Sequence, residues 1–108
     1  MMAPFIARHW HGHCPVENSE KFWAFLKNEV ANIPGKLAAY IHHTETGDLA
    51  HFYVCTFWED FDSLKEFSGD NVFAPVSDPF DIECGVVSDS IVSHFKTTVI
   101  KNPYQLSL

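Results

Sequence analysis

The sequence predicts a single α+β domain, and three observations lead to this prediction. The chain has 108 residues, a length that suits one domain and is short for two. Segments with strand composition alternate with segments of helical period in the order strand, helix, strand, strand, helix, strand. No internal repeat or low-complexity segment interrupts this order. We therefore expect one domain over residues 1–108, with a core of about 5–99 and a tail over 101–108.

Four segments have the composition of β-strands, because aromatic and β-branched residues are dense in them. They cover residues 5–13, 36–44, 49–58 and 90–100. The second and third are separated by the turn residues Glu45-Thr46-Gly47-Asp48, so we expect these two strands to form a hairpin.

Two segments have the apolar period of helices that bury one face. Pro15 opens the first, since proline loses no hydrogen bond at the start of a helix. Asp60 is a suitable N-cap for the second, and Gly69 is a suitable stop at its end. The first helix has the apolar stripe Phe22, Leu26 and Val30, and the second carries Phe61, Leu64 and Phe67.

Residues 70–89 follow neither period, and Pro75, Pro79 and Gly85 break any regular element there. We expect an irregular segment with one short helical turn near Val72. The order β-α-β-β-α-β predicts a ferredoxin-like fold, an antiparallel sheet with helices on one face. The other face needs cover, and ten Phe, three Trp and three Tyr in so short a chain favour a second buried surface. We therefore expect a homodimer.

The charge balance argues against some classes of partner. Seven Lys and Arg against fourteen Asp and Glu give a formal net charge of −7, which disfavours nucleic acid and anionic membranes. No stretch approaches the roughly 20 apolar residues of a membrane helix. The N-terminus lacks the apolar segment of a signal peptide, and the three cysteines have no metal-ligand spacing. We therefore expect reduced thiols and a cytoplasmic protein.

Several stretches, in order and spacing, line up with one known family. They are Ile6-Ala7-Arg8-His9-Trp10-His11-Gly12 with Pro15 and Glu17, Pro34-Gly35, residues 47–52 and 56–58, residues 62–64 and 67–70, and Val92-Ser93-His94-Phe95. Together they resemble the antibiotic-biosynthesis monooxygenase (ABM) domain over about residues 5–99. The chain departs from the family pattern at Leu37-Ala38-Ala39, at His42-His43 and over residues 70–89.

The resemblance implies a dimeric α+β barrel, in which two sheets pack face to face around small cavities. Some members of the family oxidise aromatic polyketides or quinols with molecular oxygen and need no metal or flavin. For this chain, the resemblance therefore implies a cofactor-independent monooxygenase that acts on a small aromatic or quinol-like substrate. The alternative is a non-catalytic dimeric ligand-binding or stress-response module, because one fold hosts many functions.

Cofactor-free oxygenation needs a base, a partner for the developing charge and a dry aromatic pocket. His94 is the candidate base, because imidazole titrates near neutrality and the family has a His in its last strand. Arg8 and Trp10 share a strand face, so Arg8 would hold an oxyanion and Trp10 would stack on a ring. Tyr40 and Trp58 are further candidates for substrate binding. The alternatives are a structural His at the dimer seam, an interface ion pair for Arg8, and packing roles for the aromatic residues.

A row of histidines on the first predicted strand raises the question of a metal. His9, His11 and His13 alternate along one strand face, and His-x-His is a zinc-ligand spacing. The further ligands would come from His42, His43 or His51. Three imidazoles on one strand reach a single metal only with strain, so we expect no metal and a solvated or seam-facing row.

Haem degradation is the other chemistry that the resemblance brings into question. Family members that degrade haem use a Trp in the second helix and a His ten residues later as the iron ligand. Phe67 and Ser77 stand at these positions here, and no His lies between His51 and His94. We therefore expect no haem and no other cofactor.

Overall fold

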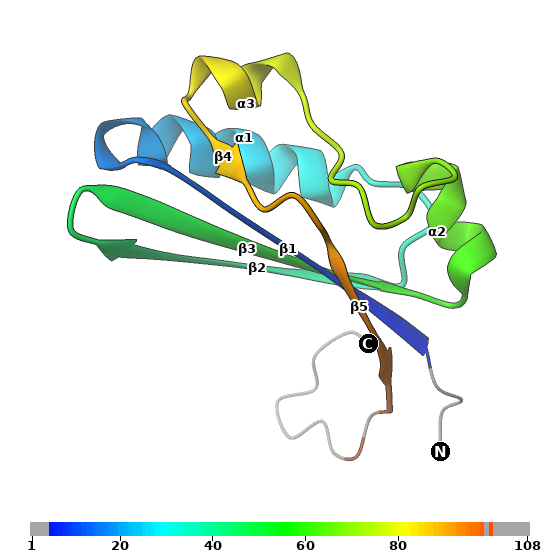
Figure 1. Cartoon of the computed structure of the whole chain (residues 1–108). Coiled ribbons are helices and arrows are strands. Elements are labelled where there is room, and N and C mark those ends of the chain that lie inside the picture. Colours follow the sequence, from blue (N-terminus) through cyan, green and yellow to red (C-terminus); the bar gives the residue numbers. More distant parts are fainter. Residues whose placement is uncertain (1–4, 99, 101–108) are drawn as a thin grey trace.

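An antiparallel sheet with helices on one face forms the framework of residues 5–98 and 100, which the computed structural model describes (Figure 1). Its strands are β1 (Phe5–Pro15), β2 (Ala38–Thr46), β3 (Leu49–Trp58), β4 (Val87–Ser88) and β5 (Ser93–Thr97). The helical elements are η1 (Val16–Asn18), α1 (Ser19–Ala31), α2 (Phe61–Ser68) and α3 (Pro79–Glu83). The α+β class and the antiparallel sheet are therefore confirmed.

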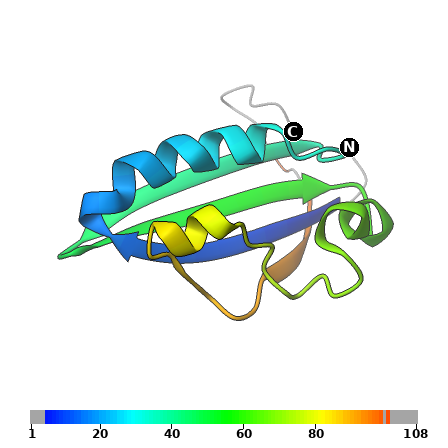
Figure 2. The same ribbon diagram turned by 90° about the horizontal axis from the view of Figure 1, so that it is seen from above.

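The strand order is consistent with a ferredoxin-like arrangement. The sheet runs β2-β3-β1, and both β4 and β5 pair with the outer edge of β1. Viewed from above, α1 and α3 lie beside each other over the sheet, and α2 lies at one end (Figure 2). The rings of Phe25 and Phe80, 4.7 Å apart between centroids, join α1 to α3.

Two short strands, β4 and β5, close this edge of the sheet, where the sequence predicted one strand over residues 90–100. Ser88 of β4 pairs with Gly12, and Ser93 of β5 pairs with His9. Residues 10–11 of β1 therefore lie opposite the longer stretch 89–92. This stretch interrupts the strand pairing and forms a bulge. Within the bulge, the Val92 amide donates to the carbonyl of Phe73 at 2.8 Å, and the Val92 side chain is fully buried. The bulge thus ties the segment before α3 to the sheet.

Local sequence explains where the two longer helices begin and what they bury. In α1, Phe22, Leu26 and Val30 form the buried stripe that their spacing predicts. Asp60 caps α2 as expected: its side chain accepts from the Ser63 amide at 2.8 Å, and the Ser63 hydroxyl completes a capping box. These contacts confirm the predicted helices.

The element boundaries correct several expectations. Strand β1 continues to Pro15, and a 3₁₀ turn (η1) intervenes before α1 begins at Ser19. Within residues 70–89, expected to be irregular, residues 70–78 follow the prediction and include a turn at Asn71–Ala74 near Val72. The regular elements α3 and β4 were not predicted. The last strand covers only Ser93–Thr97 of the expected 90–100. The predicted tail, residues 101–108, lies outside the described residues.

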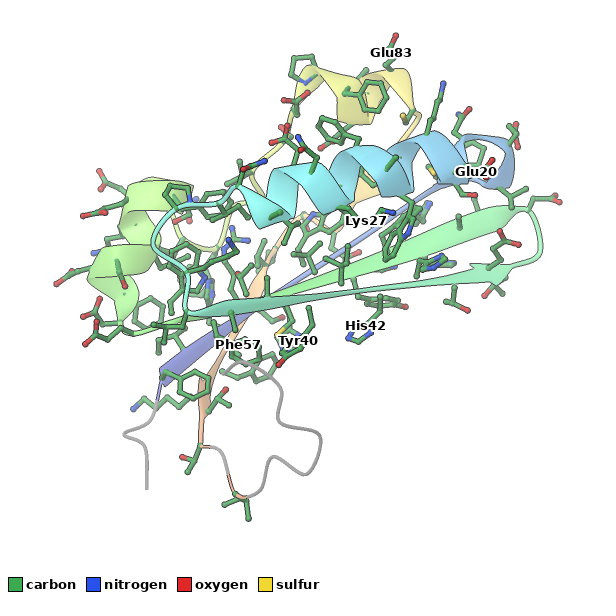
Figure 3. The ribbon with its side chains drawn as sticks, turned by 180° about the vertical axis from the view of Figure 1, so that it is seen from behind. Glu20, Lys27, Tyr40, His42, Phe57 and Glu83 are labelled. Atoms are coloured by element: carbon green, nitrogen blue, oxygen red, sulfur yellow. The ribbon has the colours of Figure 1, made fainter. Side chains whose placement is uncertain are left out.

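The two faces of the sheet differ in their cover. The side chains of Ile6, Arg8 and Trp10 lie under the helices. The alternate residues, from Phe5 and Ala7 to the histidine row, lie on the other face, which we call the open face. Tyr40, His42 and Phe57 point to this side, away from the helices (Figure 3). None of the helices in the described ranges has the length and apolarity needed to cross a membrane.

Candidate functional site

A cavity of about 160 Å³ lies between the sheet and the helices. Its sheet side is formed by β1 and β3, and its helical side by α1, α2 and the segment that leads into α3. The lining residues are Arg8, Trp10, Phe22, Phe25, Leu26, Glu29, Val30, Ile33, Val54, Thr56, Phe67, Val76, Ser77, Asp78 and Asp81. A dry cavity of about 150 Å³ holds one benzene molecule, so this cavity has room for one aromatic ring.

Arg8 is the unusual residue of the cavity. It is the single arginine of the chain, and it is only 4% exposed. Its Nη2 donates to the carbonyl of Ala74 at 3.0 Å, and its guanidinium lies 5.7 Å from the ring centre of Phe67. Its Nε is buried and has no acceptor among the described residues. A buried cation is strongly unfavourable unless it is paired. A ligand that offers a hydrogen-bond acceptor to Nε of Arg8 would therefore be stabilised here.

The guanidinium stays charged despite its burial. Desolvation lowers the pKa of Arg8 to about 10, which is still well above neutral pH. Within residues 5–98 and 100, the one salt bridge joins His11 and Asp89 on the open face, so no carboxylate neutralises Arg8. The cavity therefore presents a positive charge on its sheet side.

Trp10 lies on β1 two residues after Arg8 and has a fixed ring. Its indole Nε1 donates to the Ser88 hydroxyl at 2.8 Å, which satisfies its polar atom. Gly12 makes room for the ring: a Cβ there would come within 2.5 Å of the Trp10 ring. Trp10 is thus held by β4 and by the absence of a side chain at Gly12, and its ring forms part of the cavity wall.

Three carboxylates line the cavity on its helical side, and the sequence analysis did not identify them. Glu29 and Asp78 are exposed, and Asp81 is half-buried. Burial raises the pKa of Asp81, and the charges of Asp78 and Glu29 raise it further against a hydrogen bond from the Asp78 amide. Asp78 and Asp81 also form the capping box of α3. The signal for the two aspartates was Asp78-Pro79 followed by Asp81, a helix start that sequence can reveal.

His94 lies beside Arg8 but does not line the cavity. The two residues are cross-strand partners on β5 and β1. The His94 ring packs at 5.6 Å from Phe61 and 5.3 Å from Phe73, and neither of its nitrogens has a partner in the described part of the chain. Desolvation and then the Arg8 charge lower the pKa of His94. Its imidazole is therefore neutral at pH 7.

The other two predicted substrate-binding residues lie outside the cavity lining. Tyr40 is on the open face, where its ring meets Phe57 edge-on at 5.7 Å. Trp58 is fully buried, stacks on Phe67 at 5.7 Å and donates from Nε1 to the Thr56 hydroxyl at 2.9 Å. Trp58 thus contacts two residues of the cavity lining, Phe67 and Thr56, without lining the cavity itself. Of the predicted site residues, the cavity brings together Arg8 and Trp10.

The histidine row lies on the open face, remote from the cavity lining. His11 bonds Asp89 through Nδ1 at 3.1 Å and His51 through Nε2 at 3.0 Å. The Cys55 thiol is 3.2 Å from Nε2 of His9. In the ranges that the structure describes, no three His, Cys, Asp or Glu side chains are arranged to hold a metal ion. His11 and His51 are thus hydrogen-bonded across β1 and β3, and His9 makes a separate contact with Cys55.

The thiols and the positions used by haem-degrading proteins can also be placed. The thiols of Cys14, Cys55 and Cys84 are free and buried, and burial raises the pKa of each, to about 11 for Cys55. They are poor nucleophiles at neutral pH. Phe67 and Ser77 both line the cavity, and neither offers an iron ligand. The cavity residues do not fit haem.

Comparison with known proteins adds no relative to this description. No protein-family model matches the chain, and no curated protein matches it.

Proposed function

We propose that the protein is a homodimeric, cofactor-independent monooxygenase of the ABM type that oxidises a small aromatic or quinol-like compound with O₂. The observation that carries the proposal is the buried, unneutralised guanidinium of Arg8 in an aromatic-lined cavity. A phenol reacts with oxygen only after deprotonation, and a fixed positive charge in a dry site stabilises the phenolate. Arg8 would supply the charge, and the rings of Trp10, Phe25 and Phe67 would supply apolar surroundings.

The size of the cavity selects a one-ring substrate, and a para-hydroquinone meets the requirement. In the proposed reaction, one oxygen atom of O₂ enters the ring and the other leaves as water. The product is the hydroxyquinone, and the substrate itself supplies all the electrons. No external reductant, metal or flavin is needed to balance this reaction.

The proton of the substrate needs an acceptor, and two groups compete for the role. The sequence favours His94, which neighbours Arg8 but lies outside the cavity lining. Asp81 lines the cavity, and burial raises the pKa of its carboxyl, which makes it a better base. We therefore assign the proton of the substrate hydroxyl at the helical end of the cavity to Asp81, and a positioning role beside Arg8 to His94.

The proposed dimer would form through the open face. Tyr53 is 43% exposed and Phe95 is 52% exposed, and both lie on this face with Leu49. An exposed aromatic sheet face is unfavourable in water and suits a second copy. Two sheets packed in this way form the dimeric α/β barrel that the resemblance implies. The three free thiols suit a reducing compartment such as the cytoplasm.

Oxygen uptake by metal-stripped protein tests the proposal. The substrates are substituted hydroquinones, with an anthrone-type phenol as a larger comparison that the cavity should exclude. Uptake above the protein-free rate with one-ring compounds is expected, and it should fall at least tenfold in Arg8→Met and Asp81→Asn. Lys27→Met removes an exposed cation from α1 and should retain full activity. Absence of uptake with every compound would reject the monooxygenase.

The second candidate is a non-catalytic ligand-binding module. It is favoured by one observation, that the imidazole of His94 does not line the cavity. This candidate predicts that one-ring aromatic ligands bind without oxygen consumption, and that His94→Ala leaves binding unchanged. Oxygen uptake above the protein-free rate that falls in Arg8→Met would reject it.

A further inference from the structure

The cavity has different chemistry at its two sides, and this difference indicates which groups a matching ligand carries at its two ends. Arg8 projects from β1 on the sheet side, and Asp81 belongs to α3 on the helical side. The rings of Trp10, Phe25 and Phe67 lie in the lining, together with aliphatic side chains. A matching ligand would be polar at both ends and flat and apolar between them.

The sheet side selects an oxyanion. Arg8 uses one donor for the Ala74 carbonyl and keeps its buried Nε without an acceptor among the described residues. Guanidinium offers planar, charge-assisted hydrogen bonds that match carboxylate and phenolate oxygens. A neutral ligand of the same shape would leave the Arg8 charge uncompensated.

The helical side selects a hydrogen-bond donor. Glu29, Asp78 and Asp81 line this part of the cavity, and none of them is in a salt bridge within the described residues. An ionised carboxylate only accepts hydrogen bonds, and it repels a second anion. The end of the ligand that faces Asp81 must therefore donate, as a hydroxyl or amino group does.

We propose that the cavity binds a single-ring arene with an oxyanion at one end, on Arg8, and a hydrogen-bond donor at the opposite end, on Asp81. The para-hydroxyarene carboxylates and the monoanions of para-hydroquinones share this chemistry. This inference rests on the proposal that the cavity is the functional site. It does not depend on oxygen chemistry, because binding is measured separately from turnover.

Titration calorimetry under nitrogen tests the inference with three probes. 4-Hydroxybenzoate carries both ends, benzoate carries the anion alone, and benzamide replaces the anion by a neutral group of the same shape. A hydrogen bond to a charged group contributes enough for a difference of about tenfold or more in Kd. We expect 4-hydroxybenzoate to bind most tightly, then benzoate, with benzamide at least about tenfold weaker than benzoate. Equal affinities for benzoate and benzamide would overturn the inference.

Two variants assign the two ends. In Arg8→Met, the preference for benzoate over benzamide should disappear, whereas the control Lys27→Met should keep it. In Asp81→Asn, the advantage of 4-hydroxybenzoate over benzoate should shrink, because a neutral acceptor forms a weaker bond than a carboxylate. Preferences that persist in these variants would overturn the assignment. The comparison of probes on the unmodified protein decides the matter even where a variant does not fold.

A one-ring quinol separates the two proposals. Binding of its monoanion under nitrogen, without oxygen uptake in air, would support this inference and reject the monooxygenase. Oxygen uptake that does not depend on ionisation of the quinol, together with equal affinities for the three probes, would support the monooxygenase and reject this inference.

Discussion

Arg8 and His94 are cross-strand partners under the helices, and a buried cation and a neutral imidazole thus lie side by side without a carboxylate between them. Burial lowers the pKa of His94, and the Arg8 charge lowers it further. Both side chains leave polar atoms without partners in the described chain. The pair therefore lowers the stability of the folded protein. This is expected of a binding site in which the ligand supplies the hydrogen-bond partners.

The first prediction concerns stability without ligand. Arg8→Met replaces a buried, unneutralised cation by an apolar side chain of similar length. Even a buried ion pair can be replaced by well-packed apolar residues with a change from neutral to about 1–4 kcal/mol of added stability, and Arg8 has no ionic partner to lose within the described residues. We expect the free energy of unfolding to rise by about 1 kcal/mol, measured by urea denaturation at pH 7.5. A loss of stability of that size would show that Arg8 has a structural role.

The second prediction concerns pH. The pKa of His94 is lowered in the folded protein, so on acidification the unfolded chain takes up this proton before the folded chain does. The contribution of His94 to the free energy of unfolding should therefore be fully present above the unfolded pKa of about 6.5. It should be lost as the pH falls below that value. Urea denaturation at pH 7.5 and 5.5 measures this fall.

The variant His94→Gln should reduce the difference in stability between the two pH values, because the buried imidazole is gone. The control His43→Gln removes an exposed imidazole from β2 and should keep the wild-type difference. An unchanged difference in His94→Gln would contradict the prediction.

The third prediction concerns the ring of Trp10. In Gly12→Ala, the added Cβ would meet this ring at 2.5 Å, and the ring must move. Overpacking of this kind costs about 1–3 kcal/mol. We expect lower stability, weaker binding of 4-hydroxybenzoate and a shifted tryptophan emission. Gly47→Ala, at a turn with no side chain within 4 Å, is the control: it should lower stability through its positive φ but leave binding unchanged.

The fourth prediction concerns the assembly. Tyr53→Asp places a charge in the middle of the open face, and a buried interface does not tolerate an unpaired carboxylate. Sedimentation equilibrium should show a dimer for the wild type and a monomer for the variant. Ile82→Asp changes a residue of α3 that is 81% exposed, and it should remain dimeric. A wild-type monomer at micromolar concentration would reject the proposed dimer.

The sequence predicted the elements with a strong local period and missed those without one. The stripe Phe22, Leu26, Val30 and the strand Leu49–Trp58 follow from periodicity alone. The helix Pro79–Glu83 was missed because its five residues are too few to show a period, and only its capping residues indicate it.

The site was predicted in part for a similar reason. Alternation along β1 puts Arg8 and Trp10 on one face, but large side chains on both faces conceal which face the helices cover. The position of Asp81 depends on how the segment after α2 returns over the sheet. That return path is a tertiary property, so no local pattern could place the carboxyl in the cavity or exclude His94 from its lining.

The bulge at residues 89–92 sets the parity of the C-terminal strand. It adds an even number of residues relative to β1, so Ser88 and His94 project to the same side of the sheet. Deletion of one residue from the bulge would reverse the alternation, moving His94 to the outer surface and Phe95 beneath the helices. Length changes at this point should therefore be tolerated in pairs and not singly. The irregular connection is thus constrained in its number of residues, and not only at its buried Val92.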